Sequence, residues 1–304
     1  MPALPRRGPD LARDPLGPLL ALPGVQDAID QARAACEELR WHEAFRRRWR
    51  EVRAEADLRA ARASAAVDGA RVPLDALRAV ATGSSPGVDP ASRAGAGADL
   101  ALAVGALRAT VLAAGWRPDL GGRTEPVVPP FAQVVARLHT AAGAGWLPEP
   151  ELGRLRGAGA PQDLRGLGPA PVGDELAGRL TLLGRTVQDS QAPALVVAAV
   201  AHAELLALRP FSAGNGVVAR AVFRMLLAGR GLDPTGAVLP EAGWAVAPNP
   251  YLAAAGRYAT GTPDGVAGWL RTCAGAVREG AAAGREVADA VLAGRLRGVE
   301  PDQG

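Results

Sequence analysis

Several residue types are scarce in this chain, and each scarcity argues against a class of protein. Only two cysteines occur among the 304 residues, Cys36 and Cys273, and they lie far apart. A disulfide framework is therefore not expected, and both read as reduced core residues. Aromatic residues make up only 4% of the chain, which is few for a protein built from strands. The longest apolar stretch, around residues 192–201, is too short to cross a bilayer.

Lysine is absent, so that all 34 basic residues are arginines, and the net charge is only +3. This small charge gives no electrostatic reason to expect a nucleic-acid partner. The N-terminus carries prolines and charges where a secretory signal has an apolar core. We therefore expect a cytoplasmic protein with no nucleic-acid and no membrane partner.

The abundant residues favour helix. Apolar residues make up 48% of the chain, and the commonest of them, Ala and Leu, are strong helix formers. They recur at helical spacing between Gly- and Pro-rich stretches, which predicts an all-α fold. The expected helices cover residues 25–67, 74–80, 98–114, 131–142, 174–189, 193–208, 217–230, 250–258, 263–279 and 285–297.

Composition divides the chain into three parts. Residues 1–24 form a Pro-rich N-terminal segment, residues 25–125 an N-terminal helical region and residues 126–300 a second helical domain. Within the last part, residues 143–173 contain many glycines and prolines and show little periodicity. This stretch is expected to be a long surface excursion with room for a short hairpin.

The most informative segment is residues 209–220, which read Arg-Pro-Phe-Ser-Ala-Gly-Asn-Gly-Val-Val-Ala-Arg. Gly214, Asn215 and Gly216 precede an apolar helix, whose first N–H groups and dipole favour a phosphate. Arg220, one turn into that helix, is able to form a bidentate pair with the same anion. Local roles explain the polar residues equally well: Asn215 as a helix cap, and Arg220 as one half of a structural ion pair.

This segment resembles the motif of the Fic (Fido-fold) family, His-Pro-Phe-x-Asp/Glu-Gly-Asn-Gly-Arg-x-x-Arg. Members of the family mostly transfer AMP from ATP to a hydroxyl side chain of a target protein. The resemblance covers about residues 130–275 and implies a Fic-like helical bundle with a short β-hairpin flap before the motif loop. That flap would dock a target protein. The matching positions are Pro210, Phe211, Gly214, Asn215, Gly216 and Arg220.

Three positions depart from the family motif. The catalytic His of the family is Arg209 here, and a guanidinium does not lose its proton in a protein, so it cannot act as a general base. Ala213 replaces the acidic residue that binds Mg²⁺, and Val217 replaces the first motif Arg. His202, where the family has a His in the preceding helix, lies among apolar residues and reads as a buried structural His.

A second match lies upstream. Ser64-Ala-Ala-Val-Asp68-Gly69 is similar to the family's inhibitory helix motif, Ser/Thr-x-x-x-Glu-Gly. In members that carry it, the Glu pairs with the last Arg of the catalytic motif and keeps ATP from a reactive pose. The resemblance therefore implies a regulatory role for Ser64, Asp68 and Gly69, with Asp68 paired to Arg220. From the residues alone, a helix end capped by Gly69 is the better explanation.

These observations lead to one function with two alternatives. The first is a degenerate Fic protein that retains a nucleotide- or phosphate-binding loop at Gly214, Asn215, Gly216 and Arg220 but lacks standard AMP transfer. The alternatives are catalysis through other residues and a protein-interaction or regulatory module without nucleotide chemistry. ATP or another nucleotide is the cofactor that the retained residues suit. Mg²⁺ is not expected, and we identify no metal site.

Overall fold

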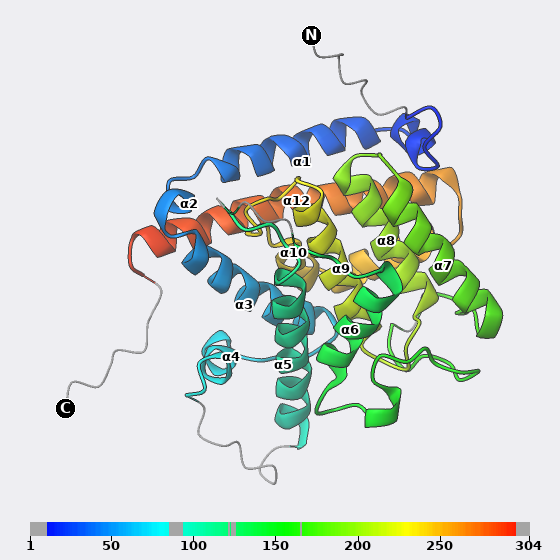
Figure 1. Cartoon of the computed structure of the whole chain (residues 1–304), viewed down its shortest axis with the longest axis horizontal. Coiled ribbons are helices and arrows are strands. Elements are labelled where there is room, and N and C mark those ends of the chain that lie inside the picture. The colour runs from blue at the N-terminus through cyan, green and yellow to red at the C-terminus, as the bar shows by residue number, and fades with distance from the viewer. Residues whose placement is uncertain (1–10, 85–93, 121, 123–125, 165, 296–304) are drawn as a thin grey trace.

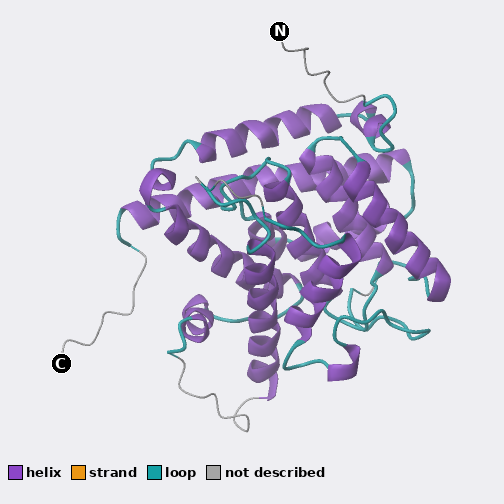
Figure 2. Ribbon diagram, viewed as in Figure 1, coloured by secondary structure: helices purple, strands orange, loops and turns teal. Residues whose placement is uncertain are grey.

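The computed structural model describes residues 11–84, 94–120, 122, 126–164 and 166–295 (Figure 1). Within these residues the regular structure is entirely helical, and no strand is present (Figure 2). The all-α prediction is therefore confirmed. Residues 1–10 of the predicted Pro-rich segment and residues 296–300 of the predicted second domain lie outside the described residues.

The helices in chain order begin and end as follows: α1 (Val25–Arg40), α2 (Ala44–Arg47), α3 (Trp49–Val67), α4 (Leu74–Ala81), α5 (Ala94–Ala114), α6 (Phe131–Gly143), α7 (Gly173–Asp189), α8 (Ala194–Leu208), α9 (Asn215–Gly229), α10 (Pro240–Val246), α11 (Pro248–Tyr258) and α12 (Pro263–Leu292). Two short 3-10 helices, η1 (Gly17–Ala21) and η2 (Glu149–Glu151), precede α1 and α7. Several helices start at or just after a proline, whose fixed φ suits the first turn.

The centre of the molecule is the pair α8 and α9, which pack against each other and are buried along nearly their whole length. Helices α11 and α12 cover α8, and α5 and α6 cover α9. Helix α1 lies along α12, so that segments from opposite ends of the chain run side by side (Figure 1). The loop of residues 209–214, called the motif loop below, joins the two central helices.

The predicted single helix over residues 25–67 is wrong, because the chain breaks twice between α1 and α3. At the break, the ring of His42 accepts a hydrogen bond from the Ala44 N–H through Nδ1 (3.2 Å), and its Nε2 lies 3.0 Å from a carboxylate oxygen of Asp289 on α12. The side chain thus caps the next helix and ties the turn to α12. Tertiary packing, and no local breaker residue, ends this helix.

The opposite error occurs near the C-terminus, where two predicted helices form the single helix α12. Gly280 and Gly284 do not interrupt it; they allow other backbone to approach. A Cβ on Gly280 would lie 2.7 Å from the Leu239 carbonyl carbon, and one on Gly284 would lie 2.4 Å from the Ala237 carbonyl oxygen. These glycines therefore mark a close contact and no helix end.

The predicted β-hairpin flap is also wrong. Residues 153–172, called the flap below, contain no strand among the positions that the structure describes. Gly153, Gly166 and Gly168 adopt positive φ values of 71°, 90° and 78°, which turn the backbone away from an extended course. The flap instead runs beside the motif loop as an irregular segment, joined to it by several hydrogen bonds.

One helix of the described residues, α5, is long and apolar enough over residues 97–114 to span a membrane by length and composition alone. In this fold it packs against α3, α6 and α9. Both cysteines are buried and unpaired, as the sequence predicts.

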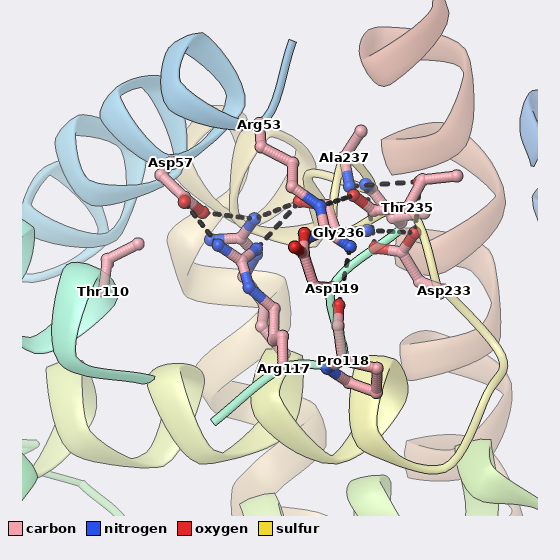
Figure 3. Close-up of polar contacts among 12 residues, drawn as sticks. Arg53, Asp57, Thr110, Arg117, Pro118, Asp119, Asp233, Thr235, Gly236 and Ala237 are labelled. Atoms are coloured by element: carbon pink, nitrogen blue, oxygen red, sulfur yellow. Dashed lines mark hydrogen bonds and ion pairs between the residues drawn. The ribbon is translucent and has the colours of Figure 1, made fainter. Parts of the chain in front are cut away.

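A buried cluster of charges joins α3 to α9 and to the segment after α9 (Figure 3). Asp57 of α3 pairs with Arg117 at 2.5 Å and with Arg224 of α9 at 3.2 Å. Both arginines also donate to the Gly236 carbonyl oxygen, each at 3.1 Å. Glu241 of α10 lies 3.9 Å from Arg224. The cluster fixes α3 against α9 and so brings the end of α3 to the start of α9.

Candidate functional site: the motif loop

The motif loop is buried and tightly turned. Arg209 has a φ of +42°, which is unusual for a residue with a side chain, and Gly214 has a φ of +78°. Phe211 is buried and stacks on His139 of α6 with ring centroids 3.8 Å apart. A left-handed residue other than glycine costs roughly 1–2 kcal/mol, so the surrounding contacts must hold Arg209 in place.

Asn215 organises the turn, although not as the helix cap that the sequence suggests. The cap position is Gly214, and Asn215 is the first residue of α9. Its side-chain oxygen accepts from the Phe211 N–H at 2.9 Å, and its side-chain nitrogen donates to the Phe211 carbonyl at 2.9 Å. The same nitrogen and the backbone N–H each donate, at 2.7 Å, to the two carboxylate oxygens of Asp163 in the flap. The anion at the start of α9 is thus a side chain of this protein.

Arg220 is fully buried and turned toward α3. Its Nε donates to the Ser64 hydroxyl at 2.8 Å, and one terminal nitrogen donates to the Ser64 carbonyl at 3.0 Å and to Asp68 at 2.6 Å. Burial lowers the pKa of Arg220, but the charge of Asp68 and the hydroxyl of Tyr251 outweigh it and leave the pKa above its ordinary value. The pair of Asp68 and Arg220 that the Fic resemblance implies is present in this structure.

Gly216 makes that pair compact. A Cβ at this position would lie 2.7 Å from a carboxylate oxygen of Asp68 and 2.9 Å from Nη1 of Arg220. Any side chain would force the ion pair apart. Gly69, the last residue of the inhibitory-like motif, has a φ of +100° and ends the turn after Asp68.

The side chain of Arg209 binds the flap and is not placed to act as a general base. Its guanidinium donates to the carbonyls of Leu164 (3.3 Å) and Gly168 (2.6 Å). Burial and the nearby charge of Arg156 lower its pKa, while Asp163 raises it, yet an Arg keeps its proton at neutral pH. The position at which the family has a base therefore carries a fixed cation.

Arg156 of the flap makes the reciprocal contact. Its Nε donates to the Arg209 carbonyl at 2.7 Å, and its terminal nitrogens donate to the carbonyls of Gly159 (2.9 Å), Pro171 (2.5 Å) and Leu208 (3.3 Å). The cation thus lies at the C-terminal end of α8, where the helix dipole favours it. Two arginines, one from each side, bind the flap and the motif loop together.

His139 fixes the other side of the loop. Its Nδ1 accepts from the Gly153 N–H at 2.9 Å, so the neutral ring donates through Nε2 to the Ala213 carbonyl at 3.0 Å. Burial lowers the pKa of His139 to about 4, although the Ala213 carbonyl and Glu151 favour the charged form. The ring is therefore neutral at physiological pH. Ser212, in the same loop, donates to the Glu151 carboxylate.

The residues present do not suit Mg²⁺. Ala213 offers a methyl group where the family has an oxygen ligand. The carboxylates of Asp68, Asp163 and Glu151 are engaged by Arg220, Asn215 and Ser212. Among the described residues, no group of three or more His, Cys, Asp or Glu is placed to hold a metal ion. We therefore derive no chemistry through a metal.

His202, the other histidine beside the motif, is a core residue. It is fully buried, and its Nε2 lies 2.8 Å from the Tyr251 hydroxyl. Four aromatic rings surround it, those of Phe223, Trp244, Tyr251 and Trp269. Burial keeps its pKa well below the ordinary value, which fits a structural role.

Two cavities lie beside the flap. A groove of about 700 Å³ runs between flap residues 166–169 and α11, and a second of about 240 Å³ lies between Leu167, Pro169 and the side chains of Glu204 and Tyr258. Neither groove is lined by residues 209–220.

Sequence reasoning missed three residues of this site: His139, Arg156 and Asp163. The sequence offers little sign of the last two, because they stand in a Gly- and Pro-rich stretch without periodicity. His139 falls on an apolar helix, where a buried His that satisfies the backbone of a loop looks no different from any core His.

Comparison with known proteins supports the fold. No family model matches the chain, and no curated protein matches it. Solved structures do: a Fic family protein from Desulfovibrio desulfuricans G20 is similar with a TM-score of 0.66 and 19% identity, over 91% of this chain and 77% of that one. Fic-1 of C. elegans gives 0.63 and 17%, over 89% and 73%.

A Fic domain containing signaling protein from Bacteroides thetaiotaomicron VPI-5482 gives a TM-score of 0.59 and 13% identity, over 86% of this chain and 98% of that one. At such identities the similarity shows the fold alone. This chain has the Fic fold, as the motif of residues 209–220 predicts.

Proposed function

We propose that this chain is a Fic-fold protein that does not transfer AMP and acts as a regulatory or binding module. The observation that carries the proposal is the side chain of Arg209, a buried cation that binds two flap carbonyls at the position of the family base. General-base catalysis contributes about 10²–10⁴ in rate. Ala213 and Val217 remove two further contributions to phosphate chemistry.

Incubation of the purified protein with labelled ATP and lysate proteins tests this proposal, with the Asp68→Ala variant alongside. If the protein were inactive only because of the inhibitory-like helix, the Asp68→Ala variant would transfer label. If the protein is inactive because it lacks the base, neither protein transfers label. We expect no label above that found with heat-denatured protein, and label transferred by either form would refute the proposal.

Nucleotide or phosphate binding by Gly214, Asn215, Gly216 and Arg220 is a separate part of the proposal. Asn215 and two of the three guanidinium nitrogens of Arg220 are engaged within the protein, so we expect weak binding that strengthens when the competing carboxylate of Asp68 is removed. Loss of a charged hydrogen bond is worth about 1.5–3 kcal/mol, or roughly ten- to a hundredfold in affinity. Calorimetric titration of ATP, ADP and phosphate measures this, and no binding to Asp68→Ala at millimolar concentration would exclude the loop as a ligand site.

A protein-binding role for the flap is the second candidate, favoured by the grooves that border Leu167 and Pro169 on two sides. Leu155 and Val172 of the flap are also 43% and 44% exposed. Pull-down with Leu155→Asp and Val172→Asp tests this role against Val111→Asp, a substitution at an exposed position of α5. A partner lost from the flap variants alone is expected, and an unchanged set of partners would rule the flap out.

A further inference from the structure

We propose that Asp163 is an internal ligand of the motif loop, whose carboxylate occupies the anion-binding position at the start of α9 and latches the flap over the loop. This inference concerns the flap and does not depend on whether the loop binds a nucleotide.

The contact has the geometry of ligand recognition. Both carboxylate oxygens are bound, one by the backbone N–H of Asn215 and the other by its side-chain nitrogen, each at 2.7 Å. A planar carboxylate held at two points by a helix N-terminus and an amide is fixed in position and in orientation. Asp163 is 52 residues away from Asn215 in the sequence, so the contact is tertiary and not a local turn.

Two arginines lie near the start of α9. Nη1 of Arg220 is fully buried beside Gly216, close to the carboxylate of Asp68, and has no hydrogen-bond partner. The guanidinium of Arg209 is close enough for the charge of Asp163 to raise its pKa. A buried cation without an anion nearby is costly.

Opposing effects act on the pKa of the Asp163 carboxyl. Burial raises the pKa of Asp163, and the charge of Asp68 raises it further, against the two hydrogen bonds from Asn215 that lower it. Two carboxylates therefore enter one electropositive loop from different elements, Asp68 from the end of α3 and Asp163 from the flap. Because they repel each other, release of either one stabilises the other, and this coupling is reciprocal.

The Arg156 and Gln162 amides report on the latch. They donate to the carbonyls of Pro210 (2.8 Å) and Ser212 (2.7 Å) and are the backbone hydrogen bonds between flap and loop among the described residues. In the Asp163→Ala variant we expect their hydrogen exchange to accelerate about tenfold or more, as loss of a charged hydrogen bond implies. The control is Glu286→Ala, which removes an exposed acid from α12 and should leave exchange unchanged.

Formate then tests the anion position directly, because it matches the carboxylate that the alanine variant lacks. Formate should slow the exchange of both amides in Asp163→Ala and leave the wild type unaffected. Unaccelerated exchange in the variant would overturn the proposal. Acceleration that formate fails to reverse would overturn it too, since it would indicate a packing defect. Should Asp163→Ala not fold, Asp163→Asn retains the volume and removes the charge, and the same acceleration is required of it.

Discussion

Substitution of Asp68 by alanine tests how the inhibitory-like helix is bound. The change leaves the guanidinium of Arg220, which is fully buried, without its carboxylate, while the two hydrogen bonds to Ser64 remain. Removal of one partner from a buried ion pair costs about 3–5 kcal/mol. The Asp68 side chain is 15% exposed, so water offsets part of the loss, and we expect about 3 kcal/mol.

Urea denaturation followed by circular dichroism measures this cost, with Glu286→Ala as the exposed control. A protein of this size changes its melting temperature by about 2–4 °C per kcal/mol, so a decrease of roughly 6–12 °C should accompany it. A double-mutant cycle with Arg220→Met isolates the pair, because methionine has similar length and no charge. A cost for Asp68→Ala below about 1 kcal/mol, or strict additivity in the cycle, would refute the inference that a buried ion pair binds the helix.

Three further predictions follow from single positions. Burial raises the pKa of Glu241 to about 7, above its unfolded value near 4.5. The protonated group therefore contributes stability that is complete below pH 4.5 and is lost as the pH rises through 7. Glu241→Gln should remove about 3 kcal/mol of this pH dependence, measured by urea titration at several pH values. Gly216→Ala, whose Cβ would press on Asp68, should destabilise by about 1–3 kcal/mol, whereas Gly229→Ala on the same helix meets no atom within 4 Å and should stabilise by about 0.5–1 kcal/mol. Arg209→His should accelerate exchange in the flap and yield no AMP transfer, because the other two motif positions stay changed; transfer by this variant would show that the base alone is missing.

Much of the fold is readable from local patterns. The start of α9 within residues 214–217 was predictable because a Gly-Asn-Gly turn meets an apolar run, and α6 was predictable because a proline precedes its apolar stripe. The breaks between α1 and α3 were not, since they depend on the contact of His42 with Asp289 across 247 residues. Helix α10 was missed because it is only seven residues long.

The residues of the candidate site also differ in whether the sequence predicts their contacts. Asp68 and Arg220 were connected through a resemblance between motifs, and not through any pattern that a single chain displays. The carboxylate that binds Asn215 had no such guide. Its residue type is common in loops, and its role depends wholly on where the flap returns to the helix.

The placement of Asp163 has a consequence for what is able to open this loop. A side chain tethered by its own backbone presents its carboxylate at an effective concentration of about millimolar or more. A metabolite below that level is outcompeted unless it binds far more tightly. A macromolecule that binds the flap backbone does not compete with Asp163 for the same position, because it moves the Asp163 side chain away together with the flap. Such a partner also makes many contacts at once. The proposed contact of Asp163 therefore predicts that access to the motif loop is controlled more readily by a protein than by the supply of a small anion.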